Sequence, residues 1–112
     1  MLVKKSENVP VEPITTAGAE KIRLRLLLAE QDGAPNFRMR LIEIAPGGCS
    51  PYHIHDYEHE AFILTGTGEL IGQNQSYPLQ AGNAVFVTAN EEHQFRNTGT
   101  QTLKFICLIP IK

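Results

Sequence analysis

The sequence lacks the features that mark several specialised classes of protein. Only two of its 112 residues are cysteines, Cys49 and Cys107, and they form neither a C-x-x-C pair nor a disulfide framework. The N-terminus has no apolar core of a secretory signal. The longest apolar run, residues 105–109, is far too short to cross a bilayer. We therefore expect a cytoplasmic protein with reduced thiols and no membrane partner.

The chain also carries little net charge. The formal net charge is −2, and no run of like charges is long enough to act as an interaction tail. Nucleic-acid binding proteins carry a basic surface, so we expect no nucleic-acid partner. The length predicts one domain, for which oligomerisation is a reasonable way to bury more surface.

No segment shows the 3.6-residue apolar period of a helix. Instead, Ile22, Leu24, Leu26 and Leu28 alternate with charged residues, which is the two-residue period of a half-buried strand. Residues 1–19 show no period and are predicted to form an N-terminal arm, whereas residues 20–112 form a single all-β domain. Further strands are expected at 37–45, 61–64, 69–72, 77–79, 84–88, 93–96 and 102–109, with Gly- and Asn-containing turns between them. Pro46-Gly47-Gly48 is expected to end the strand at 37–45, residues 65–68 to start a hairpin, and residues 73–75 to form a turn.

Histidine is concentrated in two short segments. His53, His55 and His59 lie in the stretch HIHDYEHE, and the fourth histidine is His93. In a strand, residues two apart point to the same face, about 6–7 Å apart, so these imidazoles can converge on one metal ion. The same alternation directs Glu58 and Glu60 to the opposite face. The competing interpretation, unrelated surface or hydrogen-bonded histidines, is weakened by the clustering.

These residues resemble the cupin family. Residues that match the first cupin motif are Gly47, His53 and His55; residues that match the second are Gly82, His93 and Asn97. The second motif departs from the family at Thr88, where proline is usual, and at Asn90, where glycine is usual. The resemblance covers residues 37–109. It implies a cupin double-stranded β-helix, a jelly-roll barrel of two antiparallel sheets.

The resemblance leaves two ligand sets open. His53, His55 and His93 are joined either by Glu60, as is usual in cupins, or by His59. Alternation favours the four-histidine set. The runs EHEAFILTGTG and FICLIP also resemble small single-domain cupins that have an all-histidine site and hold manganese. We therefore expect a divalent transition metal with manganese favoured, and with iron, nickel, zinc and copper as alternatives.

Three further residues are candidates for a catalytic role. Alternation in the last strand turns Cys107 inward, as a redox-sensitive thiol, a substrate contact or a small core residue. Arg40 and Arg38 share one face of the strand at 37–45 and would anchor a substrate carboxylate if that face turned inward. The apolar residues on the other face of the strand instead favour solvent exposure of the two arginines. In a four-histidine site Glu60 would accept a hydrogen bond near the ligands or lie at the edge of the core.

The expected function follows from the open positions on such a metal. We expect a metal-dependent oxidoreductase, dioxygenase-like, that acts on a small organic acid or enol. The alternatives are a metal-dependent isomerase or lyase of a sugar acid and a non-catalytic binding module. The expected partners are a small-molecule substrate and a second copy of the chain, because the long strand 20–29 offers an edge for pairing.

Overall fold

The computed structural model describes residues 1–112 and confirms the all-β prediction. It contains no α-helix, only two 3₁₀ helices at Ser6–Asn8 and Glu30–Asp32, and neither is long or apolar enough to cross a membrane. The strands are β1 (Glu12–Pro13), β2 (Glu20–Leu28), β3 (Phe37–Cys49), β4 (His59–Thr65), β5 (Thr67–Ile71), β6 (Ser76–Gln80), β7 (Ala84–Val87), β8 (Gln94–Asn97) and β9 (Leu103–Pro110).

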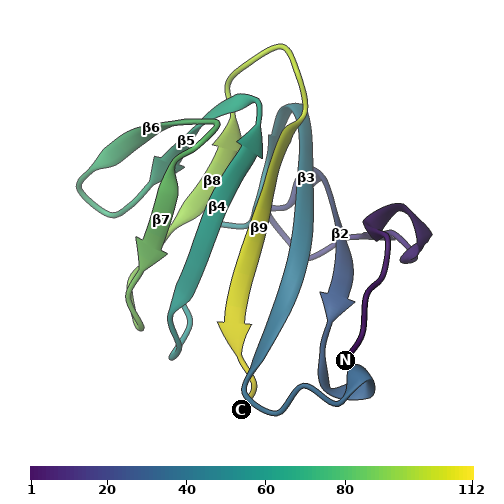
Figure 1. The fold of residues 1–112 in the computed structure, drawn as a ribbon. Coiled ribbons are helices and arrows are strands. Elements are labelled where there is room, and N and C mark those ends of the chain that lie inside the picture. The colour runs from purple at the N-terminus through teal and green to yellow at the C-terminus, as the bar shows by residue number, and fades with distance from the viewer.

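The strands form one curled sheet. Its order is β6-β5-β8-β3-β9-β4-β7, with β2 also paired to β3 and β1 paired to β2, and every pair is antiparallel. In Figure 1, β4, β7 and β9 lie in front of β5 and β8. The two expected sheets are therefore two halves of a single sheet, which β3 joins because it pairs with strands of both halves.

The bend in β3 allows it to reach both halves. The sequence predicted that Pro46-Gly47-Gly48 would end this strand, but β3 continues to Cys49. The pairing with β2 jumps there, from Ile22 opposite Ile44 to Glu20 opposite Cys49, which is a large bulge. A Cβ atom on Gly48 would lie 2.5 Å from the carbonyl oxygen of Glu20, so glycine permits the close approach of the two backbones.

The chain crosses between the halves at Gly66. A hairpin was predicted over residues 65–68, and this prediction is wrong, because β4 pairs with β7 and β9 whereas β5 pairs with β6 and β8. Gly66 has φ of +87°, in the left-handed region that favours glycine, and forms a sharp corner. The turn predicted at residues 73–75 is confirmed as the connection between β5 and β6.

Side chains on the inner side of the curl form the core. Burial alternates strictly along β9, as the two-residue period predicts. Ile44, Ile63 and Leu103 are completely buried, and the rings of Phe95 and Phe105 stack with centroids 4.6 Å apart. This apolar packing fills one end of the interior.

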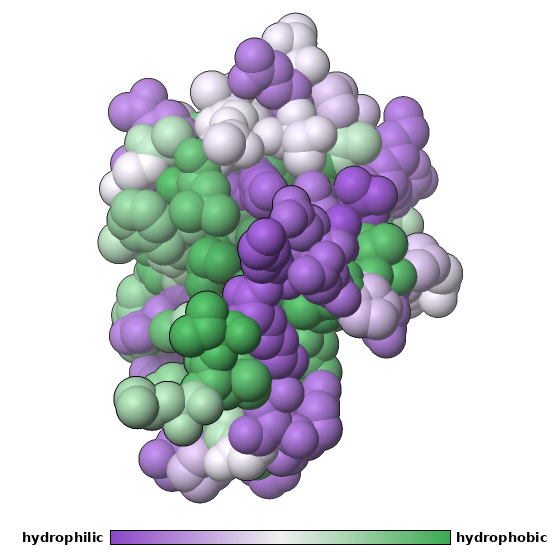
Figure 2. Space-filling model, turned by 45° about the vertical axis from the view of Figure 1, so that its right-hand side comes forward, coloured by the Kyte–Doolittle hydropathy of each residue, from purple (hydrophilic) through white to green (hydrophobic).

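The N-terminal segment packs on the outer side of β2 and β3. Val9 is buried, and its carbonyl oxygen accepts a hydrogen bond of 2.7 Å from Nη1 of Arg25. In the space-filling view, a band of hydrophilic residues runs down the face that is shown, with apolar areas on both sides of it (Figure 2).

Candidate metal centre

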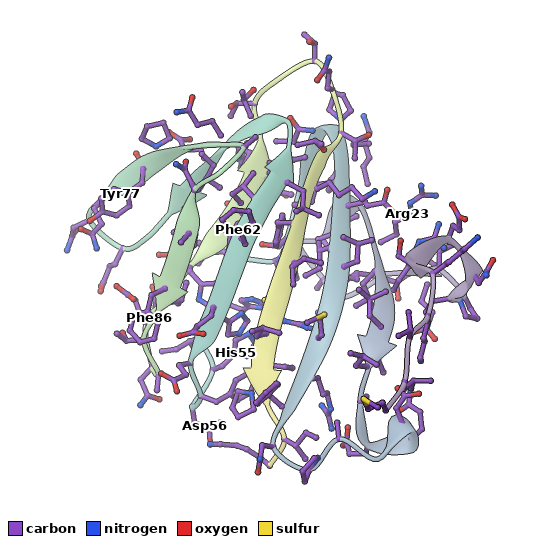
Figure 3. The ribbon with its side chains drawn as sticks, in the orientation of Figure 1. Arg23, His55, Asp56, Phe62, Tyr77 and Phe86 are labelled. Atoms are coloured by element: carbon purple, nitrogen blue, oxygen red, sulfur yellow. The ribbon has the colours of Figure 1, made fainter.

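All four histidines lie at the other end of the interior. His53 and His55 belong to the loop after β3, His59 begins β4, and His93 directly precedes β8. The backbones of His53 and His93 exchange two hydrogen bonds, of 3.1 and 3.0 Å, as an isolated antiparallel bridge. This bridge holds the two histidine-bearing segments side by side. Figure 3 shows His55 at the lower part of the sheet, below the level of Phe62.

Three of the histidines form a group that fits a metal ion. One ring nitrogen each from His53, His55 and His93 lies within 4.8 Å of the other two, and Nε2 of His53 is 3.2 Å from Nε2 of His55. A transition metal binds imidazole nitrogen at about 2.0–2.1 Å, so two donors on one ion are typically about 3–4 Å apart. Small ring movements would complete such a geometry.

His93 is already oriented as a ligand. Its Nδ1 lies 2.9 Å from the carbonyl oxygen of Glu91, which can only accept a hydrogen bond, so Nδ1 carries the proton. Its Nε2 then has a free lone pair, and this atom is buried without a hydrogen-bond partner. A carbonyl that fixes the tautomer of a histidine is typical of metal ligands.

His59 lies beside this group. Its ring stacks on that of His55, with centroids 4.7 Å apart, and its Nδ1 is 3.5 Å from Sγ of Cys107. Its Nε2 is buried and has no hydrogen-bond partner. The three-nitrogen group does not include His59, so its role as a fourth ligand stays a prediction.

Glu60 points away from the histidines. Burial alternates along β4, with His59 and Ala61 buried and Glu60 exposed. Its side chain lines the outer face of the sheet together with Phe62 and Phe86. In this geometry Glu60 is neither a metal ligand nor a hydrogen-bond acceptor for one, which corrects two of the three roles considered for it.

Arg40 and Cys107 face the interior together. Nη2 of Arg40 donates to Sγ of Cys107 at 3.0 Å, and Nε of Arg40 is buried without a partner. The apolar pattern of β3 favoured solvent for Arg40, which is wrong. The other face of β3 is itself covered: Met39 lies beside Leu2, Val3 and Val9 of the N-terminal segment, and Leu41 is buried. Arg38, at the start of the strand, instead pairs with Glu30 at the surface.

Burial keeps these imidazoles neutral. Desolvation lowers the pKa of His53 to about 4 and that of His59 to about 3, and it also lowers the pKa of His55. The positive charge of Arg40 adds to the lowering at all three. Burial raises the pKa of Cys107, with Arg40 opposing it. Neutral imidazole is the form that binds a metal ion.

The histidines, Arg40 and Cys107 line one cavity of about 540 Å³. Its lining contains no aspartate or glutamate. Apolar side chains of the core form the rest of its inner wall, including Ile42, Phe95 and Phe105. A divalent ion held here would add its charge to that of Arg40 with no carboxylate to balance either, which favours an anionic ligand.

One contribution to the cavity was not predicted from the sequence. Residues 13–16 of the predicted arm line it, although the arm has no period that would have indicated a role. Tyr57, which lies between histidines in the sequence, also lines the cavity. Its ring stacks on that of His55, with centroids 4.7 Å apart and an interplanar angle of 13°.

The fold and site together define a class: a curled antiparallel β-protein whose inner face carries a histidine cluster in a cavity. The model of the cupin domain matches residues 40–109, more than half of the chain. The chain therefore belongs to the cupin family, which confirms the resemblance seen in the sequence.

Individual relatives are diverse in function. The chain is similar to the oxalate-binding protein of Thermotoga maritima, with 29% identity over 97% of this chain and 93% of that protein. Among solved structures it is similar to the polyketide cyclase RemF of Streptomyces resistomycificus, with a TM-score of 0.93, 30% identity, and coverage of 100% of this chain and 80% of that one. A predicted oxalate decarboxylase of Thermotoga maritima shares the fold, with a TM-score of 0.88 and 24% identity over 99% of this chain and all of that one.

Proposed function

We propose that this cupin is a metal-dependent oxidoreductase, dioxygenase-like, that acts on a small organic acid or the enolate of an enol. The observation that carries the proposal is the composition of the cavity: a group of three histidine nitrogens beside Arg40, with no acidic side chain in the lining. Such a donor set leaves the positive charge of a divalent ion uncompensated, so a carboxylate or enolate is the complementary ligand.

Different residues would bind the metal ion and the substrate. His53, His55 and His93 would hold the ion, with His59 as the proposed fourth ligand. The ion would supply Lewis acidity and open positions for a substrate oxygen and dioxygen. Arg40 would bind a second oxygen of the substrate, because its buried Nε has no partner within the chain. Cys107 positions Arg40 by accepting its hydrogen bond.

The relatives support an anionic ligand and leave the chemistry open. One similar protein is named for binding oxalate, which is a small dicarboxylate, and another is a polyketide cyclase. Binding without turnover is therefore a second candidate function for this chain. Manganese is proposed as the metal only on the resemblance to small all-histidine cupins, because imidazole ligands by themselves suit zinc, copper, iron and nickel better than manganese.

The first test is the metal content of purified protein equilibrated separately with Mn²⁺, Fe²⁺ and Zn²⁺. We expect about one ion per chain in the wild type and its loss in His93→Ala. Glu60→Ala should keep the metal, because Glu60 faces outward. Loss in His59→Ala would support four histidines, and retention in His59→Ala would support a site of three. A wild type that holds no metal under any of these conditions would contradict the proposal.

The second test separates catalysis from binding. Metal-loaded protein is supplied with small carboxylic acids, oxalate among them, and with enols, while oxygen uptake and ligand binding are measured in parallel. Oxygen uptake that is lost in Arg40→Ala but partly kept in Arg40→Lys supports the proposed enzyme. Tight binding of oxalate without turnover supports the binding function, and turnover without oxygen supports an isomerase or lyase.

A further inference from the structure

The histidine cavity continues past Arg40 toward the surface. A second, more open hollow of about 670 Å³ meets it, since Leu24, Arg40 and Tyr57 line both spaces. We call this second space the outer hollow, and its other lining residues are Leu26, Glu30, Gln31, Arg38 and Ile109. The histidine cavity by itself lies in the size range that takes drug-sized ligands. The two spaces together thus have room for a molecule much larger than oxalate.

The strand register places the outer hollow directly beyond the histidine site. On β9, Cys107 lies opposite Arg40 and Ile109 lies opposite Arg38. Residues two apart in a strand share a face and lie about 6–7 Å apart, so Arg38 is the next inward residue after Arg40 in the direction away from the core. The start of β3 and the end of β9 lie together at the lower end of the sheet (Figure 1), and His55 lies toward the same end (Figure 3).

Apolar side chains line the space between the two arginines. Leu26 lies opposite Arg40 on β2 and therefore turns to the same face. Ile109 is buried on the other side, and the ring of Tyr57 lines both spaces. A molecule that extends outward from the histidines would therefore pass an apolar stretch before it reached Arg38.

Arg38 has hydrogen-bond donors that the chain does not use. Its Nε donates to one carboxylate oxygen of Glu30 at 2.7 Å, and its Nη2 donates to the other. A guanidinium group has five N–H donors, so this contact leaves Nη1 and one hydrogen of Nη2 without a partner. Nη1 and Nη2 form a second edge that can bind a carboxylate at two points. Glu30 therefore orients Arg38 without using all of its donors.

The charges along the two spaces suit a molecule with two anionic ends. Glu30 is the one carboxylate among the lining residues, and Arg38 neutralises it. Arg40 has no acidic partner in the chain. The side chains of Arg38 and Glu30 are 34% and 46% exposed, so the far end of the outer hollow is open to solvent. One cationic group thus stands at each end of an apolar stretch.

We propose, resting on the function proposed for the histidine cavity, that the substrate is an elongated dicarboxylic acid with an apolar stem. One carboxylate binds at the histidine group and Arg40. The stem lies against Leu26, Ile109 and the ring of Tyr57. The second carboxylate binds the Nη1–Nη2 edge of Arg38, which makes Arg38 the residue that sets the preferred length of the substrate.

The first test measures binding by calorimetry to protein equilibrated with Mn²⁺. The ligands are oxalate, succinate, adipate and suberate, with hexanoate and octanoate as monocarboxylates matched in length to the last two. We expect affinity to rise along the diacids, and the best diacid to bind roughly tenfold more tightly than its matched monocarboxylate. Tightest binding of oxalate, or equal binding of diacid and monocarboxylate, would overturn this assignment and leave the proposed function standing. Failure of every acid to bind would overturn both.

The second test removes the outer guanidinium. Arg38→Ala should weaken the best diacid by roughly tenfold and leave oxalate and the monocarboxylates unchanged. Arg38→Lys keeps the charge but not the two-point edge, and should recover only part of the loss. Arg96→Ala is the matched control, since Arg96 is an exposed arginine that lines neither space. Wild-type binding of the diacid in Arg38→Ala, or an equal loss for oxalate, would overturn the role of Arg38.

Discussion

The two ends of the interior differ in how their buried polar atoms are satisfied. At the closed end, next to Leu103, the side chain of Asn97 is 2% exposed and makes hydrogen bonds with both its nitrogen and its oxygen. At the open end, Nε of Arg40 and Nε2 of His59 and of His93 are buried with no partner at all. The strands β3, β4 and β9 contribute to both ends.

This difference separates the part of the interior that holds the fold from the part that holds a ligand. A buried polar atom without a partner costs about 1–3 kcal/mol, so the open end is unfavourable by itself. A metal ion and an anionic ligand would supply the missing partners. Whether an inward residue belongs to the core or to the site therefore depends on its position along the strand, and not only on the face to which its side chain points.

The largest expected effect is at the closed end. Leu103→Ala removes a side chain that is 0% exposed, and should lower the free energy of unfolding by about 2–5 kcal/mol through lost burial and a cavity. Metal content should stay at the wild-type level, because Leu103 does not line the site. Urea unfolding and elemental analysis check both outcomes. A loss of metal at unchanged stability would show that the two ends are not separate.

The next effect is at the open end and depends on metal. At a free metal concentration one hundred times the dissociation constant, binding should stabilise the wild type by about 2.7 kcal/mol, and a chelator should remove that gain. His93→Ala removes the histidine whose tautomer is already set for a ligand, so its melting temperature should not respond to metal. An equal response in wild type and variant would place the bound ion elsewhere.

A smaller effect is expected at Asn97, the polar residue of the closed end. Its Nδ2 donates to the carbonyl oxygens of Ile44 and Gln101 at 2.8 Å each, and its Oδ1 accepts from the backbone nitrogen of Gly99. Asn97→Ala leaves these buried groups unpaired and should cost about 1–2 kcal/mol in urea unfolding. Asn97→Asp would bury a carboxylate against the same two carbonyl oxygens, so at pH 7 it should destabilise the protein at least as much as Asn97→Ala.

Much of this arrangement could be predicted from the sequence because it depends on alternation. The two-residue period along 59–63 correctly turned His59 inward and Glu60 outward, and the same period in β9 turned Cys107 inward. The grouping of His53 and His55 with His93 was also predicted, from their match to two motifs. These patterns are local, because in a strand the position of a residue in the sequence decides which face of the sheet its side chain occupies.

The wrong predictions concern contacts between distant segments. The apolar face formed by the neighbouring Met39 and Leu41 predicts a solvent-exposed Arg40. Only the structure shows that chain residues near Val9 cover that face, which leaves the inner side to Arg40. Likewise, the residues around Gly66 predict a hairpin turn. No local pattern indicates that β5 pairs with β6 and β8 and not with β4.

The smallest expected effect compares two arginines on the same face of β3. Arg40 is half-buried in a cavity without a carboxylate, whereas Arg38 pairs with Glu30 and lowers the pKa of that carboxyl to about 2, from an ordinary 4.5. Because the folded-state pKa is the lower one, this pair stabilises the protein above about pH 4.5 and loses its effect as the pH falls towards 2. Glu30→Gln should therefore melt slightly below the wild type at pH 7, and the two melting curves should converge in acid. A difference that persists or grows at low pH would mean that Glu30 acts through packing and not through its charge. Added salt should also reduce the difference at pH 7, since the pair is exposed.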